Sequence, residues 1–188
     1  MKFCSECGKA TVQRIPQGDN LPRHICEHCD TIHYQNPKLV VGCLPVWNEQ
    51  VLLCKRAIEP CYGLWTLPAG FMENQESLEE AALRESREEA NANLEIENIY
   101  SIISLPHINQ VYVLYRAKLL DLDFYAGPES LDVQLFNEED IPWESLAFKT
   151  IENTLKHYYS ERKNGDFTVY NGVVSKRNRL GETIDKIR

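Results

Sequence analysis

Residues 70–92, which read GFMENQESLEEAALRESREEANA, constrain the fold of this chain more than any other segment. Ser77 and Glu80 have the spacing of a capping box, in which each side chain bonds the backbone N–H of the other residue. We therefore predict a helix that begins at Leu78. Asn91 is its expected end, because asparagine tolerates the left-handed conformation in which many helices terminate.

The predicted helix carries three glutamates on one face. Glu85, Glu88 and Glu89 lie at i, i+3 and i+4, which places them within an arc of about 100°. Their like charges repel one another, whereas a divalent cation bound between them would turn repulsion into coordination. Carboxylate oxygens suit Mg²⁺ or Mn²⁺. Arg84 and Arg87 are expected off this face, and the plain alternative is a solvated helix surface that carries a charge run.

The overall charge also favours a cation. The chain of 188 residues has a formal net charge of −8, and residues 41–162 hold 21 acidic residues against 9 basic ones. A general electrostatic attraction to nucleic acid or to an anionic membrane is therefore disfavoured, and a phosphorylated ligand needs a bound cation. No stretch approaches the ~20 apolar residues of a membrane span and we see no signal peptide, so we expect a cytoplasmic protein.

Four of the seven cysteines form two C-x-x-C pairs, Cys4 with Cys7 and Cys26 with Cys29. This spacing predicts a zinc site with four cysteine ligands, which leaves no open position for catalysis, so the zinc is expected to be structural. The alternative is four unligated thiols in a loose tail. The remaining cysteines are expected to be buried or partly buried free thiols, and three nearby histidines are expected to be polar surface: Cys43, Cys54, Cys61, His24, His28 and His33.

Apolar and β-branched runs predict a mixed α/β domain after the zinc module. We expect a hairpin of residues 38–47 and 51–55, strands at 96–105 and 110–120, and a helix within 147–162. A short strand is expected at 167–170, followed by an Asn171-Gly172 turn and a polar, mildly basic tail. The predicted organisation is therefore residues 1–35, 36–162 and a C-terminal extension of 163–188.

The pattern G-x5-E-x7-R-E-U-x-E-E-x-G-U, in which U is aliphatic, is the Nudix box, and the chain resembles it closely. The six matching positions are Gly70, Glu76, Arg84, Glu85, Glu88 and Glu89. The departures are Ser86, Asn91 and Ala92, and none of them removes a predicted metal ligand. They affect the expected packing around the helix rather than its carboxylate face.

The resemblance extends over most of residues 1–174 and points to Nudix hydrolases with an N-terminal zinc ribbon, a group that includes FAD pyrophosphatases. It implies an α/β/α sandwich around a mixed sheet, and hydrolysis of the pyrophosphate in a nucleoside diphosphate linked to another moiety. FAD, cleaved to FMN and AMP, is the expected substrate, with ADP-ribose as the alternative. NADH is less favoured because SIISLPHINQ lacks the signature of the NADH enzymes, and a nucleoside triphosphate remains open.

The resemblance also implies roles for individual residues. The Gly70 carbonyl and the carboxylates of Glu85, Glu88 and Glu89 would bind Mg²⁺ or Mn²⁺, and Glu76 would pair with Arg84. The general base is expected to be Glu88 or Glu89. The alternatives are loop glutamates, namely Glu129, Glu138 and Glu139.

Five residues are candidates for contact with the substrate: Arg56, Trp65, Phe71, Tyr112 and Glu129. Arg56 ends an apolar strand and would contact phosphate, although an arginine that solvates a strand end is the plain alternative. Trp65, Phe71 or Tyr112 would stack on a planar ring, or would simply pack at the sheet edge.

A rival hypothesis from another class is a nucleotide sensor in which the ribbon binds nucleic acid or protein. The complete set of box glutamates argues against it, and residues 1–40 hold only 5 basic against 4 acidic residues. We expect a small nucleotide as the substrate, no nucleic-acid or membrane partner, and a ribbon that serves domain packing or a homodimer.

Overall fold

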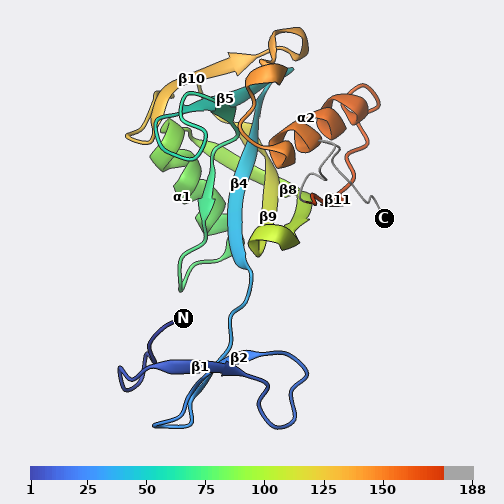
Figure 1. Ribbon diagram of the computed structural model, residues 1–188. Coiled ribbons are helices and arrows are strands. Elements are labelled where there is room, and N and C mark those ends of the chain that lie inside the picture. Colours follow the sequence, from blue (N-terminus) through green and yellow to red (C-terminus); the bar gives the residue numbers. More distant parts are fainter. Residues whose placement is uncertain (176–188) are drawn as a thin grey trace. The chain divides into compact units, whose positions relative to one another are not determined.

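The computed structural model describes residues 1–175 and divides the chain into two compact units, Met1–Pro37 and Lys38–Arg188 (Figure 1). The first unit is a three-stranded antiparallel sheet in the order β1 (Thr11–Arg14), β2 (Arg23–Cys26) and β3 (Ile32–His33). Its small size leaves little apolar core beyond Ile25 and two cysteines. Such a segment needs a metal or another crosslink to be stable.

The second unit is built on a mixed sheet in the order β10-β5-β4-β9-β8-β11, with β6 beside β5 and β7 beside β4. Its strands are β4 (Lys38–Trp47), β5 (Gln50–Arg56), β6 (Trp65–Thr66), β7 (Ala69–Phe71), β8 (Leu94–Leu105), β9 (Gln110–Leu119), β10 (Ser130–Phe136) and β11 (Tyr170–Val173). The helices are α1 (Leu78–Ala90) and α2 (Lys149–Glu161), with short 3-10 turns at Pro106–Ile108, Glu138–Asp140 and Trp143–Ser145. Among residues 1–175, no helix is both long and apolar enough to cross a membrane.

The two helices cover opposite faces of this sheet (Figure 1). Side chains alternate along β5, so that Leu52 and Cys54 join the core beneath α1 while Val51 and Leu53 join the core beneath α2. α1 contributes small residues to its core and α2 contributes large ones: Ala81, Ala82 and Ala90 from α1, and Ile151, Leu155, Tyr158 and Tyr159 from α2. The three-layer α/β/α arrangement expected from the sequence is confirmed.

Most of the predicted elements are confirmed within two residues at their ends. The hairpin joins β4 to β5 through the pairs Val46 with Val51 and Trp47 with Gln50. β4 also lies parallel to β9 over nine paired residues, which places the start of β4 beside the turn between β8 and β9. The predicted free thiols are confirmed, since Cys43 and Cys54 are buried and Cys61 is partly buried.

The C-terminal prediction was wrong in its details. The strand is Tyr170–Val173 rather than 167–170, and Asn171-Gly172 lies inside it instead of forming a turn. The strand runs parallel to β8, with Tyr170 opposite Ser101 and Val173 opposite Ser104. Pairing with a sheet edge therefore overrides the local turn preference. The predicted tail, residues 176–188, lies outside the described residues.

Candidate active site and cysteine cluster

The start and end of α1 are fixed by the residues that predicted them. Glu80 N donates to the Ser77 hydroxyl at 3.2 Å and Ser77 N donates to the Glu80 carboxylate at 2.7 Å, which completes the capping box. Asn91 adopts the left-handed conformation with φ 49° at the other end. Its side-chain amide donates to the Tyr125 carbonyl at 3.2 Å. Side-chain hydrogen bonds thereby fix both ends of the helix.

Two of the three glutamates on the metal-binding face predicted for α1 are buried next to β7. Glu85 is 9% exposed and Glu89 is 5% exposed. The Glu85 carboxylate lies against Gly70 so closely that a Cβ there would overlap it, which explains why β7 has glycine at this position. Glu89 accepts a hydrogen bond from Ala69 N at 3.0 Å. Burial raises the pKa of Glu89 to about 8 and also raises the pKa of Glu85.

Arg84 lies among these carboxylates, contrary to the prediction that it points away from them. It forms a bidentate pair with Glu76, with Nε at 3.0 Å and Nη2 at 2.8 Å. Its third nitrogen, Nη1, bonds Glu85 at 2.7 Å and Glu88 at 3.2 Å. The long arginine side chain reaches Glu88 one helical turn away. The angular position of Arg84 around the helix gave the direction of its Cα–Cβ bond but not the reach of its guanidinium. The predicted pairing of Glu76 with Arg84 is present, and it lowers the pKa of Glu76 to about 2.

These residues fit a divalent cation. The carboxylates supply hard oxygen ligands, and burial disfavours the ionised forms of Glu85 and Glu89 when no cation is bound. A cation nearby favours the ionised form of a buried carboxyl and so offsets the cost of its burial. The Glu88 side chain is 58% exposed and stands at the open side of the group.

A fourth carboxylate reaches the same place from another loop. Gly127 N donates to the Glu89 carbonyl at 3.0 Å, and a Cβ on Gly127 would overlap the Glu88 carbonyl oxygen. This close approach docks residues 127–130 onto the end of α1. Glu129 then lines the same cleft as the box glutamates, and its charge contributes to the raised pKa of Glu89.

The glutamates open into a cleft of about 1020 Å³ in the second unit. Four of the five candidates for substrate contact line it: Arg56, Phe71, Tyr112 and Glu129. Trp65 does not line it, because the ring is buried against Phe136 with their centroids 4.9 Å apart. Glu138 and Glu139 also lie outside the lining, and Glu138 pairs with Arg162 at 2.9 Å.

Several residues that line the cleft were not predicted from the sequence. Phe148 and Thr150 enter it from the start of α2, and His107 and Ile108 from the turn between β8 and β9. Both segments were assigned only to secondary structure, with no charge cluster to mark them. Ile108 is 48% exposed, and a large exposed apolar side chain at a cleft favours ligand contact, but this exposure is a property of the fold that the sequence does not carry.

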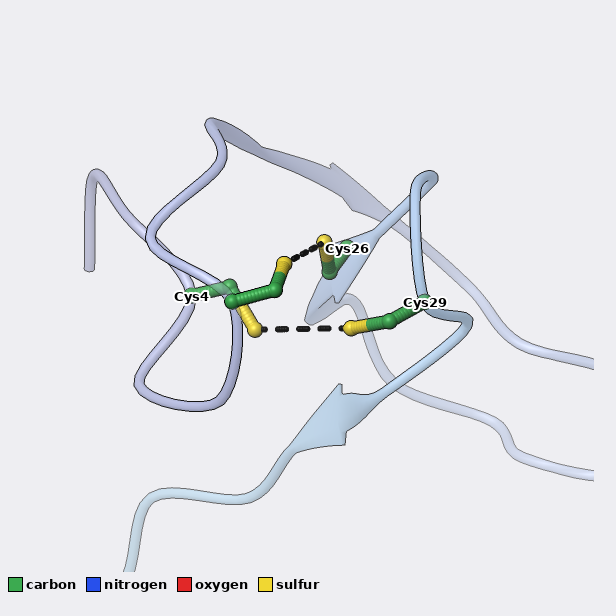
Figure 2. Close-up of side chains that lie close together, drawn as sticks. Cys4, Cys26 and Cys29 are labelled. Carbon is green, nitrogen blue, oxygen red and sulfur yellow. Dashed lines mark hydrogen bonds between the residues drawn. The ribbon is translucent and has the colours of Figure 1, made fainter.

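The two cysteine pairs come together in the first unit (Figure 2). The Sγ atoms of Cys4 and Cys29 are 3.7 Å apart, those of Cys7 and Cys26 are 3.4 Å apart, and all four lie within 4.8 Å of one another. Within residues 1–175, ligand atoms are gathered this tightly at the cysteines and not at the glutamates of α1. His33, predicted to be plain polar surface, contacts the Cys4 sulfur at 3.3 Å.

Known families match both units. The family described as Nudix N-terminal, a zinc ribbon, matches residues 2–35, and the NUDIX domain family matches residues 36–156. A crystal structure of a NUDIX hydrolase from Nitrosomonas europaea is 59% identical and covers 94% of this chain and 100% of its own, with a TM-score of 0.91.

Curated relatives carry several different activities in their names. An ADP-ribose pyrophosphatase from Methanocaldococcus jannaschii is 29% identical over 66% of this chain and 75% of its own length. A NAD-capped RNA hydrolase NudC from Pseudomonas fluorescens is 31% identical over 87% of this chain but only 58% of its own length. The chain thus spans little more than half of that relative. Because the NUDIX domain match alone covers more than half of the 188 residues, the chain belongs to the Nudix hydrolase family, with a zinc ribbon at its N-terminus.

Proposed function

We propose that this chain is a metal-dependent pyrophosphatase that hydrolyses the pyrophosphate bond of a nucleoside diphosphate linked to a second moiety. The observation that carries the proposal is the group of four carboxylates at one cleft, Glu85, Glu88 and Glu89 on α1 and Glu129 on the facing loop. These four carboxylates repel the phosphates of an anionic substrate unless cations lie between them.

Mg²⁺ or Mn²⁺ would be held by Glu85, Glu88 and Glu89 with the Gly70 carbonyl. When bound, such an ion neutralises charge on phosphate oxygens and increases the acidity of water. Arg84, held by Glu76 in a bidentate pair, orients Glu85 and Glu88 at the mouth of the cleft. A Zn²⁺ ion would be held by the four cysteines, where it has a structural role.

The proton acceptor must be reached by water. The Glu88 side chain is 58% exposed, whereas Glu89 is 5% exposed and already accepts a hydrogen bond from Ala69 N. We therefore place Glu88 first as the general base. Glu129, which is exposed and lines the cleft, is the alternative.

The size and lining of the cleft favour a substrate with two large moieties. Its volume of about 1020 Å³ lies at the upper end of the range for small-molecule sites. Phe71 and Tyr112 offer aromatic rings on which a planar ring system can stack. FAD is the substrate we propose from the sequence resemblance. ADP-ribose, which appears in the name of a relative, is the second candidate and shares the same bond to be cleaved.

A third candidate is NAD-capped RNA, because relatives 28–31% identical are named as hydrolases of it. The chain's charge argues against a long RNA partner, since residues 1–40 hold only 5 basic residues against 4 acidic ones. A capped RNA and free NADH therefore belong in the same substrate panel as FAD and ADP-ribose.

The test is chromatography of the products after incubation of the purified chain with each substrate, in Mg²⁺, in Mn²⁺ and in EDTA. We expect AMP with FMN from FAD, or AMP with ribose 5-phosphate from ADP-ribose, in either metal and neither product in EDTA. Release of nicotinamide mononucleotide from the capped RNA, which leaves a 5′-monophosphate on the RNA, with no product from FAD or ADP-ribose, would replace our substrate with that of the NudC relatives. No product from any member of the panel in either metal would contradict the pyrophosphatase proposal itself.

A further inference from the structure

The first backbone N–H groups of α2 lie at the cleft, and the helix supplies no hydrogen-bond acceptors for them. Phe148 occupies the N-cap position, and its side chain cannot accept a hydrogen bond. The Phe148 carbonyl accepts from Ile151 N at 3.1 Å and from Glu152 N at 3.2 Å, as part of the helix. The N–H groups of Lys149 and Thr150, in the first turn, have no partner within the helix. These two amides lie at the positive end of the helix dipole.

Thr150 adds an unpaired hydroxyl at the same place. The residue lines the cleft and is 1% exposed, and its Oγ1 atom has no hydrogen-bond partner among residues 1–175. Most buried polar side chains in proteins are paired. Thr154, one turn further along the same helix, is paired: its hydroxyl bonds the Thr150 carbonyl at 2.9 Å and Ser101 at 3.0 Å. Tyr159 on α2 also has a buried hydroxyl with no partner among residues 1–175, but of these two residues only Thr150 lines the cleft.

A buried arginine adjoins this corner. Arg56 is 8% exposed, and its guanidinium lies over the Phe148 ring, 5.2 Å from the centroid. Nε donates to the Pro60 carbonyl at 2.9 Å. In the described part of the chain, no carboxylate lies within 4.0 Å of this guanidinium, so its charge is not neutralised by an ion pair. Its remaining nitrogens are available to a ligand in the cleft.

We infer that Arg56, the Thr150 hydroxyl and the first amides of α2 form a phosphate subsite at the α2 end of the cleft. The inference rests on the proposed function, because it assigns a second, metal-independent phosphate contact to the same substrate. Every group in the subsite is a donor, and two of its elements are positive, the guanidinium and the end of the helix. An anion with several acceptor oxygens satisfies all of them, and phosphate is the anion that a nucleotide carries.

The phosphate has two possible sources. One is a phosphoryl group of the pyrophosphate itself, whose other phosphoryl group would then face the glutamates. The other is a separate phosphate on the ribose, as in a 2′-phosphorylated dinucleotide. Both sources present the same chemistry to Arg56 and Thr150, and the kinetic experiment below separates them.

The first experiment measures binding without metal. Calorimetry in EDTA with adenosine 2′,5′-bisphosphate and with inorganic pyrophosphate as probes tests the chain's own donors, because chelation removes the contribution of the glutamate site. We expect Arg56→Gln to weaken the binding of at least one probe about 10-fold or more, since a hydrogen bond to a charged group is lost. Thr150→Val should weaken it several-fold, and Thr150→Ser, which keeps the hydroxyl, should not.

Thermal unfolding shows whether the variants act through the fold. Thr150→Val removes an unpaired buried hydroxyl at nearly constant volume, so its Tm should rise or stay equal while its affinity for the probe falls. A merely structural role for Thr150 would instead lower both Tm and affinity together. Equal affinity of wild type, Arg56→Gln and Thr150→Val for both probes would overturn the subsite.

The second experiment compares the KM for ADP-ribose with the KM for its 2′-phosphate in wild type and in Arg56→Gln. An equal rise in both KM values assigns the subsite to the pyrophosphate, and a rise for the 2′-phosphate alone assigns it to the separate phosphate. An unchanged KM for both, with hydrolysis intact, would contradict the subsite and leave the proposed function standing. A different outcome is that wild type binds the probes and the variants do not, while wild type hydrolyses no substrate. This outcome would support the subsite and contradict the proposed function.

Discussion

Glu76 shows how a residue outside the carboxylate group supports it. Its carboxylate accepts both arms of the Arg84 fork and also a hydrogen bond from Glu73 N. Through Arg84 it reaches Glu85 and Glu88, which do not contact it directly. The bidentate pair holds the guanidinium in one orientation, as planar arginine pairs generally do. Loss of Glu76 would therefore loosen the contacts of Arg84 with both of these glutamates.

The Glu76 pair predicts a pH dependence of stability. The Arg84 guanidinium lowers the pKa of Glu76 in the folded chain from 4.5 to about 2. A lowered pKa stabilises the fold above the unfolded value, and this stabilisation is lost as the pH falls from about 4.5 towards 2. The difference in free energy of unfolding between wild type and Glu76→Gln, measured in EDTA, should have its maximum value at pH 6 and a smaller value at pH 3. A difference that is the same at both pH values would contradict the ion pair.

Some residues of the candidate site could be predicted from a pattern within one segment of the sequence, and others depend on contacts between distant segments. Gly70, Glu76, Arg84 and the three α1 glutamates were predicted because the helix period and the box fix their spacing along one segment. The position of Arg84 was wrong because a long side chain reaches neighbours that its Cα does not face. Thr150 was missed because its unpaired hydroxyl is a property of the fold that no sequence pattern carries.

At the scale of elements, the junction of α1 with the loop before β10 explains a departure from the box pattern. Asn91 stands where the pattern has glycine, and it adopts the left-handed conformation with φ 49°. The Asn91 side chain donates a hydrogen bond to the Tyr125 carbonyl at 3.2 Å, which glycine could not make. This bond offsets the cost of the left-handed conformation. The bond ties the end of α1 to the loop that leads to Gly127 and Glu129.

Two variants at Asn91 should therefore separate these contributions. Asn91→Ala loses both the hydrogen bond and the tolerance of the left-handed conformation, so we expect a loss of about 1–2 kcal/mol in the free energy of unfolding. Asn91→Gly loses the bond but relieves the backbone, so its free energy of unfolding should stay within about 1 kcal/mol of wild type. Urea unfolding of both variants measures the difference. Equal losses in the two would show that backbone conformation contributes nothing there.

The secondary structure was predictable where alternation or helix period is strong, as in β4, β9 and α1. β11 was displaced by three residues because its position depends on the register with β8, a contact between distant parts of the chain. β6 and β7 are too short, at two and three residues, to show any period. β7 nevertheless brings Gly70 to the glutamates.

The whole molecule consists of two units with different sources of stability. Residues 38–175 have large apolar cores on both faces of the sheet, whereas the first unit buries little apolar surface beyond Cys4, Ile25 and Cys26. The four sulfurs lie within 4.8 Å of one another, as tetrahedral coordination of one ion requires. Folding of the first unit should therefore be linked to metal binding.

Substitution of one cysteine tests this linkage. Cys26→Ser should abolish hydrogen-exchange protection in residues 1–35 and leave the protection of β4, β9 and α1 unchanged. Cys61→Ser is the matched control, since Cys61 is a free thiol outside the cluster. Light scattering of the same samples tests whether the ribbon supports a homodimer. Wild-type protection of β1 and β2 in Cys26→Ser would contradict a structural metal site.

The most direct test of the central claim, a carboxylate group on α1 that binds a divalent cation for pyrophosphate hydrolysis, is the kcat of Glu88→Gln for ADP-ribose in Mg²⁺. Glu79→Gln is its control, because Glu79 is exposed on the same helix and does not line the cleft. We expect kcat to fall by about 100-fold or more in Glu88→Gln with an unchanged Tm, and to stay near wild type in Glu79→Gln. Wild-type turnover by Glu88→Gln, or an equal loss in both variants, would contradict the account.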